Sequence, residues 1–296
     1  MANMVLKGMG IALITPFMED ESVDYEALLK LVEYQIQNGT DYLVVLGTTA
    51  ETATLSEEEQ VDVVKAVVKQ VNRRIPVVQG VSSNCTHTVV KKMKEGSYQG
   101  IDAILSVVPY YNKPSQEGIY QHFKAIANAT SIPIVLYNVP GRTGMNMSAE
   151  TTLRIAHEFK HVIAVKEASG NFAQIDAILK NKPDHFQVIS GDDGITFPMI
   201  ALGAVGVISV IGNAFPGDFG RMVNLALAGD YDNARTLHSR LTEMIELLFV
   251  DGSPAGVKSL LHLMGFCENK LRLPLVPART HTYEKIREAW QKLNIK

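Results

Sequence analysis

Short apolar runs rich in β-branched residues recur along the chain and alternate with amphipathic segments. The runs are nearly continuous, which is typical of strands that are buried on both faces of a parallel sheet. Their starts lie roughly 30 residues apart, the length of one strand–helix unit, although the last two are closer and leave room for only a short helix. We predict strands at residues 10–15, 42–46, 76–79, 103–108, 133–138, 162–167, 187–190 and 206–210.

The segments between these strands have the pattern of helices packed on one face. In residues 25–38 four aliphatic side chains share a face, namely those of Leu28, Leu29, Val32 and Ile36. Ser56 precedes three glutamates, which predicts a helix start with a capping box. The unbroken alternation predicts an α/β fold, a (β/α)8 TIM barrel over residues 1–216. An open doubly wound sheet is the alternative.

The pattern changes after the eighth unit, where helices follow one another directly. We predict helices at residues 218–228, 231–249, 254–264 and 280–293, and the stretch 271–275 is open to a short strand. Residues 217–296 are therefore expected to form a C-terminal helical region, including the last barrel helix, that packs on the barrel.

Composition narrows the classes of partner. The 296 residues are 46% apolar and 20% charged, and the net charge of −3 gives no electrostatic basis for binding nucleic acid or an anionic membrane. Cys85 and Cys267 form no CxxC pair, and the N-terminal apolar run is too short for a signal peptide. We expect a cytoplasmic protein that acts on small molecules.

Polar residues follow five of the predicted strands, and TIM barrels place their chemistry at this end. Lys166 comes directly after the apolar run 162–165, so its amine is expected near the barrel interior. Burial disfavours ammonium, and a neutral amine can form an imine with a ketone. The alternative is a lysine paired with a carboxylate at the barrel mouth. Lys258 also follows apolar residues, but there we expect a stem on apolar surface and an amine in solvent.

Further candidates lie at neighbouring strand ends. Tyr137 ends the strand before Lys166 at a matching height, where a phenol can donate and accept protons. Thr48 and Tyr111 carry hydroxyl groups that could relay a proton. Arg142, in a glycine-rich turn, is suited to bind a carboxylate through two hydrogen bonds. Taken singly, each is equally compatible with packing or with a surface position.

One motif points to different chemistry. Residues 157–161 read HEFKH and match the HExxH pattern of helical zinc sites. However, a strand is predicted to begin at Val162, so the pair would lie at the opposite end of the barrel from the other polar groups. No third ligand is evident, and we expect no metal site here.

The motifs together are specific. The sequences GTTAE, PYYNKPSQEGIYQHFKAIA, LYNVPGRTG, VIAVKEASGN, ISGDD and GVISV occur in the order and spacing of the dihydrodipicolinate synthase family. The resemblance continues through LFVDGSPAGVK and LRLPLVP. It implies a Schiff-base lyase that condenses pyruvate with L-aspartate 4-semialdehyde to 4-hydroxy-tetrahydrodipicolinate, on the route to diaminopimelate and lysine. It also implies that no cofactor is needed, since the lysine is the electron sink.

The resemblance assigns catalytic roles. Lys166 is the imine lysine and Tyr137 the general acid and base. Thr48 and Tyr111 complete a proton relay, with Tyr111 reaching in from a neighbouring subunit of a homotetramer, a dimer of dimers. Ala50 stands where many members have glycine, a change that is tolerated if the backbone there has negative φ.

It also assigns substrate contacts. Thr48 and Thr49 hold the carboxylate of pyruvate, and Arg142 binds the carboxylate of the semialdehyde. Gly191 and the backbone carbonyl of Ile208 line the site.

The effector site of the feedback-inhibited members is altered here. Two histidines of that site are replaced by Glu57 and Gln60, and a glutamate that holds the ammonium of lysine is replaced by Thr88. Asn84 and Tyr110 remain as a remnant of the site. We therefore expect weak or absent inhibition by L-lysine, because a charge partner is lost.

Two alternatives stay open. One is another enzyme of the superfamily, an N-acetylneuraminate lyase or a 2-keto-3-deoxy-sugar-acid aldolase, which would share the imine lysine. Arg142 and the pair Tyr110–Tyr111 favour the synthase, because a small carboxylated aldehyde needs a cation and little room. The other is a non-enzymatic sensor on a barrel, which would bind pyruvate without a covalent adduct.

Overall fold

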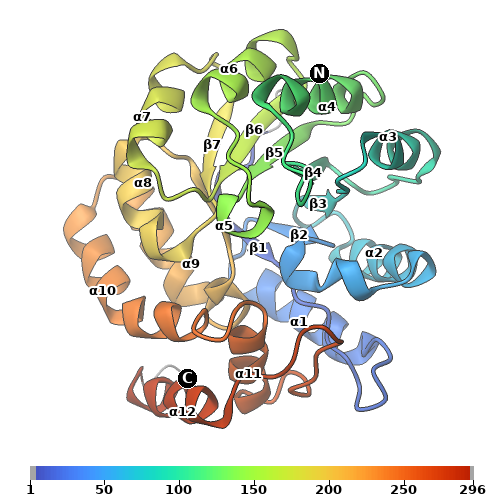
Figure 1. Cartoon of the computed structure of the whole chain (residues 1–296). Helices are drawn as coiled ribbons and strands as arrows, with labels where there is room; N and C mark the ends of the chain where they lie inside the picture. Colours follow the sequence, from blue (N-terminus) through green and yellow to red (C-terminus); the bar gives the residue numbers. More distant parts are fainter. Residues whose placement is uncertain (1–4, 294–296) are drawn as a thin grey trace.

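A computed structural model describes residues 5–293 of the protein. Parallel strands close into a barrel in chain order, and helices surround it (Figure 1). The strands are β1 Gly8–Ala12, β2 Tyr42–Val45, β3 Val77–Gly80, β4 Ala103–Val107, β5 Ile134–Asn138, β6 Val162–Glu167, β7 Gln187–Ser190 and β8 Gly206–Ser209. Because β1 pairs with β8, the predicted TIM barrel is confirmed and the open doubly wound sheet is wrong.

The outer ring contains one principal helix between successive strands. These helices are α1 Tyr25–Gln37, α2 Glu57–Val71, α3 Thr86–Glu95, α4 Gln116–Ala127, α6 Ala149–Glu158, α7 Phe172–Asn181 and α8 Thr196–Leu202, and α9 Pro216–Leu227 follows β8. The capping box at Ser56 is present, with Ser56 Oγ accepting from the backbone N–H of Glu59 at 3.1 Å. The helix between β7 and β8 is short, as the strand spacing predicts.

Short helical turns follow several strands at the end of the barrel where chemistry is expected. They are η1 Thr48–Ala50 and η2 Thr52–Thr54 after β2, α5 Pro140–Thr143 after β5, η3 Asp193–Ile195 after β7 and η4 Ile211–Asn213 after β8. Because each of these turns follows a strand end, they lie at the mouth of the barrel.

Two apolar layers hold the barrel. One lies between the strands and the outer helices, and the other fills the barrel and includes Val44, Leu105, Val135, Tyr137 and Ile189. Closure between β8 and β1 requires a very close approach of their backbones. A Cβ atom on Gly206 would lie 1.9 Å from the carbonyl oxygen of Gly8, so only glycine fits there.

The C-terminal helices cover one side of the barrel (Figure 1). The helix α9 contacts β1 and β8, α10 Tyr231–Leu247 packs on α9, and α11 Ala255–Leu263 and α12 Thr280–Leu293 pack on each other. The stretch 271–275 is not a strand, so that alternative is wrong. Its leucines lie in an irregular segment that returns to the loop after β2.

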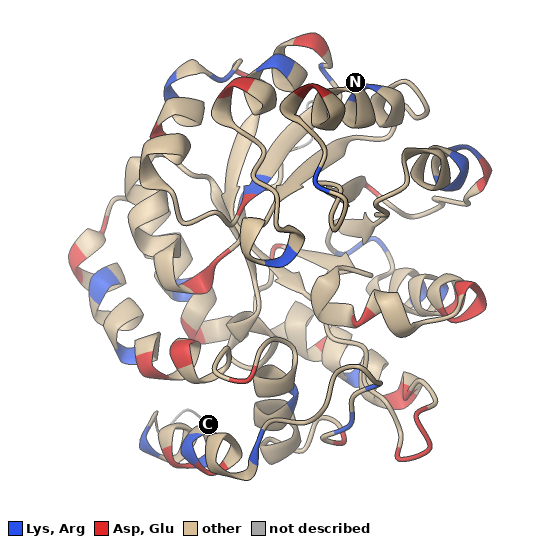
Figure 2. Ribbon diagram, in the orientation of Figure 1, with Lys and Arg blue, Asp and Glu red and all other residues tan. Residues whose placement is uncertain are grey.

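Charged residues lie mostly on the outer helices and loops, and few lie on the strands (Figure 2). The barrel interior is therefore largely uncharged, and a charged group placed there is exceptional. Among residues 5–293, no helix combines the length and the apolar character that crossing a membrane requires.

Candidate active site

Lys166 and Tyr137 lie side by side in the barrel. They are register partners on β6 and β5, and the amine of Lys166 lies 4.5 Å from the centre of the Tyr137 ring. Lys166 is 5% exposed and Tyr137 is 6% exposed. The predicted matching height of the two residues is therefore confirmed.

Burial sets the charge state of Lys166. It lowers the pKa of the amine to about 8. Two charges act on the same pKa in opposite directions, since the Asp193 carboxylate raises it and the Arg142 guanidinium lowers it. Within residues 5–293, Lys166 has no ion pair with a carboxylate at 4.0 Å or less. A substantial fraction of the amine is consequently neutral near pH 8 and able to attack a carbonyl carbon.

The phenol of Tyr137 lies close to the side chain of Thr48, which follows β2. Burial raises the pKa of the Tyr137 phenol, while the charge of Arg142 and a hydrogen bond with the Thr48 side chain lower it. Thr48 begins η1, directly after β2. The Thr48 side chain therefore lies close to the Tyr137 phenol within one chain.

Tyr111 is placed differently. It follows β4 in a loop, its side chain is 86% exposed, and its backbone has a φ of 76°. A bulky residue with positive φ is strained and needs a reason to be there. Within the single chain the Tyr111 ring is directed into solvent and is not packed beside Tyr137.

The turn that carries Thr49 is tightly hydrogen-bonded. The carbonyl of Ala50 accepts a hydrogen bond from the Thr15 hydroxyl at 2.8 Å, and the carbonyl of Gly47 accepts one from Thr52 at 2.9 Å. Ala50 is not among the residues with positive φ, so alanine is accommodated where many family members have glycine. Thr49 is itself buried.

Arg142 lies in the short helix α5, a turn of helix within the loop predicted as a glycine-rich turn. Its guanidinium donates to the carbonyl of Ser253 at 3.4 Å, and its charge reaches both Lys166 and Tyr137. The side chain is otherwise exposed. A cation in this position can meet an anion that enters from solvent.

Gly191 borders Lys166 on the far side from Tyr137, where β7 pairs with β6. A Cβ atom on Gly191 would lie 3.1 Å from Cγ of Lys166, so a larger residue would displace the lysine stem. Ile208 is buried on β8. The structure thus gathers Lys166, Tyr137, Thr48, Arg142 and Gly191 in one site.

Asp193 is a member of this site that the sequence did not single out. It is buried, and its carboxylate accepts hydrogen bonds from the backbone N–H groups of Val210 at 2.9 Å and Ile211 at 2.8 Å. Burial raises the pKa of the carboxyl to about 6, against those hydrogen bonds. The pair Asp192–Asp193 was visible at a strand end, but the sequence could not show that only the second is buried.

The amine of Lys258 does not lie where the sequence analysis places it. Lys258 does not extend its amine into solvent, since its side chain is fully buried and its amine lies 2.5 Å from Oε1 of Glu51. The sequence-based interpretation is wrong because the partner carboxylate comes from a loop that is remote along the chain. Glu51 closes the GTTAE motif, so this pair lies behind the predicted pyruvate-binding turn.

The two histidines of the HExxH pattern do not share a helix. The helix α6 ends at Glu158, His157 contacts the carbonyl of Asn181 at 3.1 Å, and His161 contacts the carbonyl of Ala127 at 3.0 Å. Residues 5–293 contain no group of three potential metal-ligating side chains. The pattern arises where a helix ends and β6 begins.

The altered effector positions lie on the outer surface. Glu57 is exposed and lies 3.7 Å from Lys92, while Gln60 donates to the carbonyls of Thr52 and Leu55. Gln60 is therefore hydrogen-bonded to the loop after β2, and Glu57 adds a negative charge one helical turn away from Gln60. Tyr110 is partly exposed.

Comparison with known proteins assigns the family. The model of the Dihydrodipicolinate synthetase family matches residues 5–293. A 4-hydroxy-tetrahydrodipicolinate synthase of Parabacteroides distasonis is 73% identical over the full length of both chains, and one of Phocaeicola vulgatus is 66% identical over 98% of each. A dihydrodipicolinate synthase structure from Aquifex aeolicus has a TM-score of 0.95 at 42% identity, covering 98% of both chains. The chain therefore belongs to the dihydrodipicolinate synthetase family.

Proposed function

We propose that this chain condenses pyruvate with L-aspartate 4-semialdehyde to 4-hydroxy-tetrahydrodipicolinate, through an imine on Lys166. One observation supports this most strongly: a buried lysine whose pKa is lowered to about 8 lies beside a buried tyrosine at the mouth of a TIM barrel. The relatives at 73% and 66% identity carry the synthase name, which favours this reaction over the sugar-acid lyase alternative.

The chemistry follows from the side chains. The neutral Lys166 amine attacks the ketone carbon of pyruvate, and loss of water gives an iminium ion. The iminium withdraws electrons, so a methyl proton is lost and an enamine forms. The enamine carbon attacks the aldehyde carbon of the second substrate and forms the new carbon–carbon bond. The amino group of that substrate then displaces the lysine nitrogen, which closes the ring and frees Lys166.

Tyr137 supports the proton transfers of this sequence. Its phenol can deliver a proton to the departing hydroxyl group and recover one later, because it is close to Lys166 and is hydrogen-bonded to Thr48. Thr48 and Thr49 are proposed to hold the carboxylate of pyruvate. Gly191 and the carbonyl of Ile208 are proposed to line the same pocket.

Arg142 is proposed to select the second substrate. Its exposed guanidinium at the mouth suits a carboxylate that arrives after pyruvate is bound. A sugar aldehyde such as N-acetylmannosamine has no carboxylate for this cation. Assaying both aldehydes with the same enzyme preparation tests the assignment, and turnover of N-acetylmannosamine would contradict it.

Tyr111 is proposed to complete the relay of a neighbouring subunit, within a homotetramer built as a dimer of dimers. Its 86% exposure and its positive φ fit a side chain whose contacts lie outside its own chain. One solved relative, 40% identical with a TM-score of 0.95, is a monomeric dihydrodipicolinate synthase variant. A monomer of the present chain that kept full activity on dilution would contradict the shared tyrosine.

Inhibition by L-lysine is proposed to be weak or absent. Glu57, Gln60 and Thr88 replace the polar residues expected at an effector site, while Asn84 and Tyr110 remain. Because Gln60 is bonded to the loop after β2, it is not free to bind an effector. A titration of activity with L-lysine is expected to be flat at low concentration, and strong inhibition there would contradict this proposal.

Borohydride trapping tests the central claim. Reduction of the enzyme in the presence of pyruvate, followed by peptide mass analysis, is expected to place a pyruvate-derived adduct on Lys166. An adduct on another lysine, or no adduct, would overturn the mechanism. The same result separates the enzyme from a barrel that merely binds pyruvate.

A further inference from the structure

A second buried lysine lies behind the predicted pyruvate-binding turn. Lys258 of α11 and Glu51, the residue after η1, are both fully buried, and their Nζ and Oε1 atoms are 2.5 Å apart. The pair joins the C-terminal helical region to the loop after β2. Neither residue has a role in the imine chemistry described above.

The pair is enclosed by further acceptors and donors. Lys258 Nζ donates to the carbonyl of Lys270 at 2.9 Å and lies 4.1 Å from the centre of the Phe17 ring. Oε2 of Glu51 accepts from the backbone N–H of Arg272 at 3.1 Å. Both charges are therefore held by polar contacts from a segment that follows α11.

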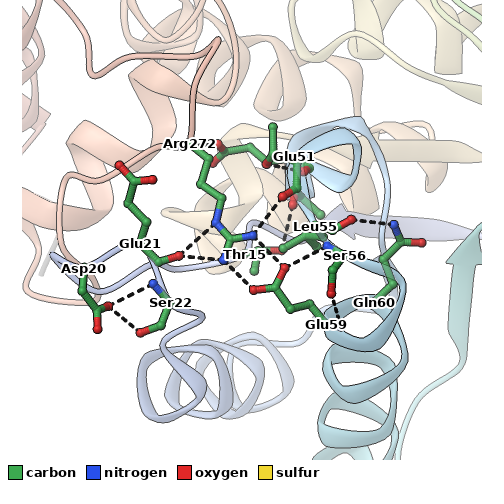
Figure 3. Close-up of polar contacts among 12 residues, drawn as sticks. Thr15, Asp20, Glu21, Ser22, Glu51, Leu55, Ser56, Glu59, Gln60 and Arg272 are labelled. Carbon is green, nitrogen blue, oxygen red and sulfur yellow. Dashed lines mark hydrogen bonds and ion pairs between the residues drawn. The ribbon is translucent and has the colours of Figure 1, made fainter.

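Arg272 extends this network to the start of α2 (Figure 3). Its guanidinium pairs with Glu59 at 2.5 Å and donates to the carbonyl of Thr54 at 2.9 Å, and it lies 4.5 Å from the Phe17 ring. The carbonyl of Glu21 accepts from it as well. The loop after β2 is consequently fixed from Glu51 to Glu59 by residues of the C-terminal region.

The backbone conformation of Glu51 shows why the loop after β2 needs these contacts. Glu51 has left-handed dihedrals, φ 55° and ψ 35°, and its N–H donates to the carbonyl of Thr48 at 3.1 Å. A residue with a side chain adopts this conformation at an energetic cost, and it persists where its surroundings hold it. The side chain of Glu51 is held by Lys258, so the ion pair is placed to hold the turn that carries Thr48 and Thr49.

Stability alone is a poor explanation for the pair. Removing two charges from water is costly, and apolar replacements of buried pairs are often as stable. Burial lowers the pKa of Lys258, and the Glu51 carboxylate opposes that shift. In some proteins a buried ionic contact serves to fix one structural arrangement and not to add stability.

We propose that Glu51 and Lys258 are positioning residues, which hold the turn of Thr48 and Thr49 in the geometry that binds pyruvate and keeps the Thr48 hydroxyl bonded to Tyr137. The inference rests on the proposed function of that turn. It predicts that disturbing the pair impairs the pyruvate half-reaction and leaves recognition of the semialdehyde at Arg142 largely intact.

The test compares Lys258→Met, Glu51→Gln and the double variant that carries both. In each single variant the KM for pyruvate is expected to rise about 10- to 100-fold, the range for a small misplacement of binding groups. The rate of borohydride trapping at low pyruvate is expected to fall in step, while the KM for the semialdehyde changes little. The double variant removes both charges, so it is expected to recover thermal stability without recovering the pyruvate KM.

A matched control changes another ion pair of the same region. Arg279 and Asp251 are 2.5 Å apart, and their ion pair joins the loop after α10 to the start of α12 and not to the turn after β2. Arg279→Gln is expected to lower the unfolding temperature slightly and to leave the pyruvate KM unchanged.

The outcomes separate the two proposals. If the folded double variant binds and traps pyruvate as the wild type does, or if every variant loses stability alone, the positioning role is wrong. If the wild type gives no adduct on Lys166, the proposed function fails instead. The double variant carries no unpaired buried charge. If the single variants fail to fold, the double variant can therefore still be compared with the wild type.

Discussion

Residues 5–293 contain two buried lysines in similar surroundings, and they differ in the group that faces the amine. Lys166 lies 4.5 Å from the ring centre of Tyr137, and Lys258 lies 4.1 Å from that of Phe17. Burial lowers the pKa of both. Lys258, however, has the carboxylate of Glu51 at 2.5 Å, whereas the tyrosine beside Lys166 offers a phenol. Burial alone thus does not make a nucleophile, because a carboxylate in contact favours the charged form of the amine and occupies it.

The most severe test of this comparison is Lys166→Arg, which keeps a cation and removes the nucleophile. We expect kcat to fall by roughly 10⁴-fold or more, as when a covalent nucleophile is lost, and borohydride with pyruvate to leave the protein unlabelled. Steady-state rates and peptide mass analysis measure both effects. Labelling of Lys258 in this variant would show that the ion pair with Glu51 does not prevent its amine from reacting, and would contradict the distinction drawn between the two lysines.

A second change makes the two aromatic neighbours alike. Tyr137→Phe leaves a ring beside Lys166, as Phe17 does beside Lys258, and removes the hydroxyl that bonds Thr48. The value of kcat is expected to fall about 10²- to 10³-fold, the contribution of a general acid and base. Tyr98→Phe is the matched control, since the Tyr98 hydroxyl bonds the carbonyl of Lys92 on the outer ring. Equal activity of Tyr137→Phe and the wild type would remove the phenol from the mechanism.

The two lysines also show what the sequence could reveal. Lys166 could be identified because a TIM barrel fixes where a strand end points, and strand periodicity is a local property. The partner of Lys258 could not be identified, because Glu51 belongs to a different element and no local pattern records that contact. The interpretation of Lys258 as a surface lysine was therefore wrong, although its helix was placed correctly.

Strand ends show the same limit on a smaller scale. The predicted strand at residues 10–15 runs past β1, which ends at Ala12, because Leu13 and Ile14 are buried without belonging to the strand. Apolar side chains indicate that a residue is buried and not that its backbone pairs with another strand, so the apolar run overestimates the length of the strand. In the site, likewise, Asp192 and Asp193 are chemically identical in sequence, and only the turn after β7 decides which one is buried.

The smallest effect expected concerns the charge that tunes Lys166. The Arg142 guanidinium lowers the pKa of Lys166, because a nearby cation disfavours ammonium. Arg142→Gln should therefore raise that pKa above its present value of about 8, so that less amine is neutral at a given pH. The rate of borohydride trapping with pyruvate alone, followed across the pH range around 8, should rise with pH in both proteins and have its midpoint at higher pH in the variant.

The second substrate provides the internal control for this variant. Loss of the guanidinium should also raise the KM for the semialdehyde about 10- to 100-fold, the range for a hydrogen bond to a charged group, and this effect should persist above the midpoint, where Lys166 is neutral in both proteins. A pKa effect and a binding effect are thereby measured in separate assays of one protein. A midpoint that moved to lower pH would mean that Asp193, which acts in the opposite direction on Lys166, is disturbed by the substitution, and that the two charges do not act independently on the amine.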